Sequence, residues 1–295
     1  MIYELAALCA ALCWAFAGII SHGPSTKLGA VAFVRLRLVI VSVLFAFWVA
    51  FTGSWSTLSA EATGGLVISG LVGIFLGDWA LFATMNRLGP RLTAILFSLN
   101  APMAVILGWL VLDERLKPIS MFAIGLTLVG VILAVFFGRR ASQRHIFETT
   151  QGRLDVGIAL GLTAAFCQAA ASLIARPVMA AGPDPVAASL VRLATGAIAL
   201  SLLMIFVRST RQKAPLDRST IIVVVISALL AMALGMTLVL FALVGGEVGI
   251  VSTLTATTPV LILPLLWITT HERPAAGAFA GAVLVVIGTA LLFNR

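Results

Sequence analysis

Long apolar stretches constrain the fold of this chain more than any other feature of its sequence. Ten of them follow one another between clusters of charged residues, Pro and Gly, at residues 4–21, 31–52, 63–85, 91–112, 119–137, 155–175, 186–207, 219–243, 248–270 and 275–293. About twenty apolar residues in an α-helix cross the hydrocarbon core of a bilayer. Because that core offers the backbone no water, each stretch is predicted to be a helix. The sequence thus predicts an all-α polytopic membrane protein with ten transmembrane helices.

The composition excludes a soluble globular protein. Hydrophobic residues make up 61% of the chain and charged residues 10%, whereas soluble domains carry about 25% charged residues. The net charge is +8, but the basic residues lie between the apolar stretches rather than along one stripe. A nucleic-acid partner is therefore not expected, and the lipid bilayer is the expected surrounding.

The distribution of basic residues predicts how the chain is inserted. Fourteen of the 19 Lys and Arg residues lie in or beside the odd-numbered connections, among them Arg35 and Arg37, and five, among them Arg192, lie on the other side. Because Lys and Arg are enriched in cytoplasmic loops, this count places the odd-numbered connections in the cytoplasm and both termini outside.

The two halves of the chain repeat one another at a spacing of about 157 residues. The matching features, in chain order, are Val34-Arg35-Leu36 with Val191-Arg192-Leu193, Pro102 with Pro259, Glu114-Arg115 with Glu272-Arg273, and Gly130 with Gly288. Each half holds five stretches, an odd number, so the second half enters the membrane in the opposite sense. Such inverted repeats are typical of secondary transporters. The predicted organisation is a first five-helix repeat at 1–137, a basic linker at 138–154 and a second five-helix repeat at 155–295, arranged around a central cavity.

On these motifs the sequence resembles the drug/metabolite transporter superfamily, in its ten-helix form with two EamA-type repeats. Within the superfamily it is most similar to the YddG-type exporters of aromatic amino acids. The resemblance implies secondary transport across the bacterial inner membrane. It also implies cytoplasmic termini, the opposite of the charge count, so both orientations stay open.

Asp78 is the only acidic residue well inside a predicted helix. An ionised carboxylate at the bilayer centre costs roughly 2.5–3.5 kcal/mol on insertion scales, which favours a position facing a cavity. There it could carry a coupling proton or bind a substrate amine. The alternative is a structural partner for Arg87, Arg91 or a helix end.

Polar residues accompany a proline in the fourth helix of each half. They are Ser98, Asn100 and Pro102 in the first half and Thr257, Thr258 and Pro259 in the second. Proline removes a backbone donor and breaks the helix, and helix breaks at matched positions point to a transporter's binding site. The alternative is that these side chains bond their own backbone carbonyls or join neighbouring helices.

Aromatic and amide side chains could complete the wall of such a site. Trp14 and Gln168 occupy equivalent positions in the first helix of each half, and Trp79 and Phe82 follow Asp78. Together they could hold a flat apolar side chain, unless the aromatic rings face lipid. Arg35 and Arg192 could clamp a carboxylate, but anchoring of helix ends is the favoured interpretation, and Glu114 is predicted to be structural.

The predicted function is export of small metabolites, amino acids including aromatic ones first among them, by alternating access. Protons are possible coupling ions. The sequence holds no Walker motif and no intramembrane His/Cys/Asp cluster, so no cofactor, metal or enzymatic activity is expected, and the chain is expected to act as a monomer. The alternatives are export of cationic drugs or nucleotide sugars, or an intramembrane enzyme acting on lipid-linked substrates.

Overall fold

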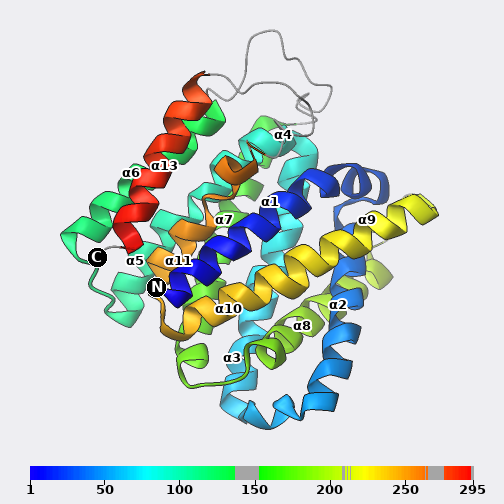
Figure 1. Ribbon diagram of the computed structural model, residues 1–295. Helices are drawn as coiled ribbons and strands as arrows, with labels where there is room; N and C mark the ends of the chain where they lie inside the picture. Colours follow the sequence, from blue (N-terminus) through cyan, green and yellow to red (C-terminus); the bar gives the residue numbers. More distant parts are fainter. Residues whose placement is uncertain are drawn as a thin grey trace.

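A computed structural model describes residues 1–136, 153–207, 210, 212, 214–262, 264 and 276–293, and every regular element in these ranges is a helix (Figure 1). Eight helices are long and apolar enough to cross a membrane, and two shorter apolar helices span Val248–Ile262 and Gly277–Phe293. The all-helical prediction is thus confirmed, whereas the count of ten crossings stays a prediction. Nearly all of the predicted linker lies outside the described residues.

The first half runs through six α-helices. They are α1 (Ile2–Leu28), α2 (Ala30–Thr52), α3 (Ala60–Gly70), α4 (Trp79–Ser98), α5 (Asn100–Leu112) and α6 (Pro118–Phe136). A π-helical segment, η2 (Leu71–Asp78), continues α3 directly into α4, so that these three elements form one long crossing. This crossing ends at Gly89, whose φ of 77° bends α4. A side chain rarely adopts that conformation, and glycine does so without steric cost.

The second half repeats this order. Its helices are α7 (Leu154–Ala180), α8 (Pro185–Phe206), α9 (Arg218–Ala228), α10 (Met236–Gly245), α11 (Val248–Thr255) and α13 (Ala276–Phe293), with the π-helical segment η5 (Leu229–Gly235) between α9 and α10. The caps repeat as well. Ser59 caps α3 by accepting from the Ala62 N–H, and Asp217, 158 positions later, caps α9 by accepting from the Thr220 N–H.

The two halves interlock rather than stand side by side. Helix α1 packs against α9, η5 and α10 of the second half, and its equivalent α7 packs against α3, η2 and α4 of the first. Equivalent helices also pair with each other, α2 with α8, α5 with α11, and α6 with α13, the last pair lying at one edge of the bundle in Figure 1. The repeat seen in the sequence is therefore also a repeat of contacts, and the space between the halves is lined by both.

Small residues allow these helices to approach closely. A Cβ atom on Gly281 of α13 would lie 2.4 Å from the Ala134 N of α6, and one on Gly73 of η2 would lie 2.5 Å from the Ala171 Cβ of α7. Lipid tails are as apolar as the helices, so close van der Waals contact between small residues holds such bundles together. Larger side chains at these two positions would force the helices apart.

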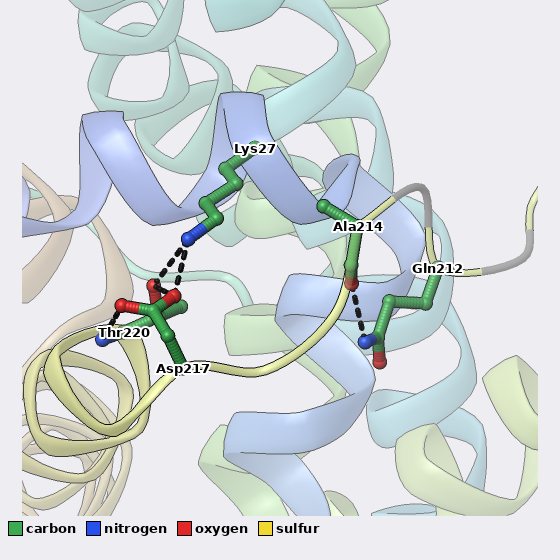
Figure 2. Close-up of polar contacts among 5 residues, drawn as sticks. All are labelled: Lys27, Gln212, Ala214, Asp217 and Thr220. Atoms are coloured by element: carbon green, nitrogen blue, oxygen red, sulfur yellow. Dashed lines mark hydrogen bonds and ion pairs between the residues drawn. The ribbon is translucent and has the colours of Figure 1, made fainter.

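Side-chain contacts join the halves at both ends of α1. Near its C-terminal end, the Lys27 Nζ forms an ion pair with Asp217 and donates a hydrogen bond of 3.2 Å to the Thr220 Oγ1 (Figure 2). At the other end, Tyr3 packs on Phe241, with ring centroids 5.5 Å apart. These contacts tie the first helix of one half to the third crossing of the other.

Candidate functional site

A cavity of about 220 Å³ is lined by residues from both halves. Its wall comes from α1, α2, α4, α7, the end of η2, the middle of η5, the start of α10, and the end of α11 with the break that follows it. The lining residues are Trp14, Ala17, Gly18, Ser21, Arg37, Asp78, Leu81, Phe82, Met85, Thr93, Ala94, Phe97, Ser98, Gln168, Ala231, Met232, Met236, Thr255, Ala256, Thr258, Pro259 and Ile262. Both predicted helix breaks thus border one cavity.

The structure breaks both helices directly before the prolines. Helix α4 ends at Ser98 and α5 begins at Asn100, while α11 ends at Thr255 and helical backbone resumes at residue 258. Pro102 and Pro259 consequently lie in the first turn of the resumed helices, where a missing N–H removes no intrahelical hydrogen bond. The breaks follow from the proline positions.

Side chains at the breaks satisfy the carbonyls that the turns leave open. Asn100 Nδ2 donates to the Phe97 carbonyl at 2.5 Å, and Thr257 Oγ1 donates to the Leu254 carbonyl at 2.6 Å. The two donor residues, Asn100 and Thr257, are 157 positions apart, and so are the two acceptor residues, Phe97 and Leu254. The Thr258 hydroxyl donates a hydrogen bond of 2.7 Å to the Thr255 carbonyl. Residue 259 would be the usual backbone donor to this carbonyl, but it is a proline and has no N–H. Local backbone bonding, the second interpretation of these residues, is therefore present in both halves.

The first helix of each half rests on the π-helical segment of the other. Trp14 Nε1 donates to the Ala231 carbonyl of η5 at 3.0 Å, and a Cβ on Gly235 would lie 2.6 Å from that nitrogen. In the other half, a Cβ on Gly77 of η2 would contact Cys167 at 3.3 Å, next to Gln168. The wider turns of a π-helix free carbonyls for such bonds and are frequent at functional sites.

Three charged residues lie inside the bundle around the cavity. Arg37 and Arg192 are 2% and 1% exposed, and both act electrostatically on the carboxylate of Asp78. The Oδ2 of Asp78 is buried and has no hydrogen-bond partner in the described part of the chain. Only Arg37 and Asp78 of the three line the cavity. Arg87, one of the two arginines suggested as partners from their proximity in sequence, is not among the charges acting on Asp78, and the side chain of Arg91 lies outside the described residues.

The burial of two arginines corrects the sequence interpretation. Arg37 and Arg192 were counted among the charges that set topology, but buried side chains do not mark a loop. Without them the count is thirteen to four, so the predicted orientation is unchanged. Arg35, the motif equivalent of Arg192, instead donates to the Ser201 hydroxyl at 2.8 Å on α8 and does not line the cavity.

The structure brings together most of the residues predicted for the site. Those that line the cavity are Trp14, Asp78, Phe82, Ser98, Gln168, Thr258 and Pro259, and those that do not are Trp79, Asn100, Pro102 and Thr257. The residues that sequence reasoning missed include Arg37, Thr93, Phe97, Met232 and Met236. The sequence offers one signal for Arg37, because this charged residue is the seventh residue of the apolar stretch predicted at 31–52.

Within the described ranges, no three His, Cys, Asp or Glu side chains are grouped so as to hold a metal ion. The polar groups of the wall are instead a guanidinium, a carboxylate, an amide and several hydroxyls. With the rings of Trp14, Phe82 and Phe97 they can bind a small solute that combines charged and apolar parts.

Comparisons with known proteins agree with this architecture. A crystal structure with 18% sequence identity matches 99% of this chain and 96% of its own, with a TM-score of 0.77, which shows the same fold. A search of the curated proteins found no match. The model of the EamA-like transporter family matches residues 1–136 and again residues 155–294, one match in each half. The chain therefore belongs to the EamA-like transporter family.

Proposed function

We propose that this member of a small-molecule transporter family exports small metabolites, amino acids including aromatic ones first among them. The cavity wall carries the proposal: Trp14, Phe82 and Phe97 offer apolar surface to a flat side chain, and Arg37 and Asp78 offer both signs of charge. An amino acid presents the complementary groups, an ammonium, a carboxylate and a side chain. A nucleotide sugar would require several basic residues for its phosphates, and the described wall contains one, Arg37.

The proposed mechanism is alternating access, and two features support it. On α1 the cavity wall extends from Trp14 to Ser21 and does not reach the first turns of the helix. Near those first turns, Glu114 instead accepts a hydrogen bond of 2.9 Å from the Val248 N–H of the other half. Burial raises the pKa of the Glu114 carboxyl, while this hydrogen bond and Arg176 oppose the rise. A cavity between two repeated halves that stops short of the first turns of α1 suits a state open to one side, which exchange of the two halves' conformations would reverse.

We further propose that the chain acts as a monomer in the bacterial inner membrane, with protons as coupling ions. The resemblance to bacterial exporters supports the location. Because Asp78 is a carboxylate at the cavity within a crossing, it is the group proposed to carry the proton.

A counterflow assay tests the proposed function. Purified protein in liposomes preloaded with unlabelled amino acid should take up labelled phenylalanine transiently above equilibrium, and protein-free liposomes should not. If counterflow occurs only with cationic drugs or nucleotide sugars, these compounds and not amino acids are the substrates. Chemical conversion of the added compound would show an enzyme instead.

A further inference from the structure

The guanidinium of Arg37 lies at the cavity and keeps N–H donors that no described residue accepts from. Among the described residues its one hydrogen bond runs from Nη2 to the Ser227 carbonyl at 3.3 Å, and the buried Nε has no partner. The side chain is 2% exposed and lines the cavity. A guanidinium has five N–H donors, so Arg37 can still donate to a ligand.

Aromatic rings hold this guanidinium in place. Its central carbon lies 5.1 Å from the ring centroid of Phe33 and 5.7 Å from that of Phe82, and the two rings meet edge to face with centroids 5.1 Å apart. Rings interact with the flat face of a guanidinium, which leaves its N–H edge for hydrogen bonds. The two ring contacts and the bond to Ser227 therefore limit the positions open to the guanidinium before a ligand arrives.

Among the described residues, the buried charges around the cavity are not balanced. Two buried cations, Arg37 and Arg192, face one carboxylate, Asp78. In the described part of the chain neither arginine comes within 4.0 Å of a carboxylate oxygen. A buried cation without a close counter-ion is unfavourable, so an anionic group that enters the cavity would gain from both arginines.

We propose that Arg37 binds the carboxylate of the cargo and that compounds lacking this group are rejected. Arg37 is preferred over Arg192 because Arg192 does not line the cavity and donates from Nη1 to the Met236 Sδ at 3.3 Å. Guanidinium and carboxylate match in shape and bond in pairs. This inference rests on the proposed function and names the substrate class: carboxylates with an apolar side chain, cations excluded.

Competition in the wild-type protein tests the substrate class without any substitution. Labelled phenylalanine is taken up in the presence of unlabelled phenylalanine, phenylalaninamide or phenethylamine. We expect the amide and the amine to compete at least about tenfold more weakly than phenylalanine, since each lacks the charge-assisted bonds to Arg37. Equal competition by the amide would overturn the proposal.

Substitution then tests the residue. Arg37→Gln should weaken phenylalanine uptake at least about tenfold and abolish its advantage over the amide, whereas Arg37→Lys, which keeps the charge, should retain part of both. Arg35→Gln is the matched control, because Arg35 lies on the same helix but bonds to Ser201 outside the cavity. An unchanged preference in Arg37→Gln, or the same loss in Arg35→Gln, would overturn the assignment.

A binding measurement separates this proposal from the proposed function. Phenylpropionate should raise the melting temperature of the purified wild-type protein and phenethylamine should not, and Arg37→Lys should reduce the shift. If the wild type transports no amino acid but shows this pattern, the proposed function is wrong and the carboxylate site stands. If amino acids are transported but phenylpropionate and phenethylamine do not give this pattern of melting-temperature shifts, the carboxylate site is wrong.

Discussion

Adjacent residues in the segment Gly77-Asp78-Trp79 serve different parts of the protein. Asp78 lines the cavity, whereas Trp79 packs against the apolar core that α2 and α8 share. Trp14, in contrast, lines the cavity while its indole N–H is bound to the Ala231 carbonyl. The aromatic wall therefore depends on Trp14, Phe82 and Phe97, and the two tryptophans form a matched pair for an experiment.

We expect Trp14→Ala to remove the preference for aromatic over small cargo, and Trp79→Ala to leave it unchanged. Loss of the buried contact between an indole and an aromatic side chain corresponds to about tenfold or more in affinity. The measurement is the ratio of KM values for phenylalanine and alanine in proteoliposomes. An unchanged ratio in Trp14→Ala, or an equal change in Trp79→Ala, would contradict the proposed wall.

Asp78→Asn should separate transport from the proton gradient. If Asp78 carries the coupling proton beside Arg37 and Arg192, the variant cannot release it, and an imposed pH gradient should no longer drive accumulation of cargo. Counterflow without a gradient should persist. Asp155→Asn is the control, since Asp155 lies at the start of α7 in an exposed pair with Arg153. Gradient-driven uptake that survives in Asp78→Asn at the wild-type level counts against coupling through this residue.

At the scale of elements, each helix break and each π-helical segment has an equivalent in the other half. The prolines and polar residues predict the breaks from the sequence alone. The π-helical segments η2 and η5 carry no such signal, because Leu71–Asp78, apart from Asp78 itself, and Leu229–Gly235 are apolar and would suit an α-helix equally well. Contacts with the other half, such as Trp14 with Gly235, accompany the wider turns.

The N-terminal cap of α9 gives a prediction about pH. Lys27 first, and Thr220 second, hold the pKa of the Asp217 carboxyl well below its ordinary value. Because the folded-state pKa is the lower one, the stabilisation is complete above the ordinary value of about 3.9 and is lost as the pH falls below it. Asp217→Asn should therefore lower the melting temperature at pH 7, by at most about 3 °C for an exposed pair.

The same comparison at pH 3 should show a smaller difference, and high salt at pH 7 should reduce it as well, because exposed charges are screened. Lys27→Met is the companion variant and should lower the melting temperature by the same amount. The double variant with Asp217→Asn should lose no more than either single variant, because both remove the same ion pair. A difference that grows as the pH falls would contradict the assignment of this ion pair.

At the scale of the whole molecule, the two repeats interlock rather than lie side by side. Helices α1 and α7 each pack into the opposite half, so neither half encloses the cavity alone. The predicted orientation of this assembly rests on the remaining Lys and Arg residues of the sequence, thirteen against four after the two buried arginines are removed.

The charge count predicts that the C-terminus faces the outside of the cell. Alkaline phosphatase fused there should be active and a green fluorescent protein dark, because the first folds outside the cytoplasm and the second inside it. A phosphatase fused within the connection between α8 and α9 should be inactive and serves as the internal control. The reverse pattern would establish cytoplasmic termini, as the family resemblance implies.

The sequence by itself determined the membrane location, the helical class, the two-repeat organisation, the family and the two breaks, because hydropathy, spacing and proline act locally along the chain. Only the tertiary structure decided which side of each helix meets the cavity. A membrane helix is apolar toward lipid and toward its neighbours alike, so no periodicity distinguishes Trp14 from Trp79. The burial of Arg37 likewise depends on Phe82 and Ser227, which reach it from distant parts of the chain.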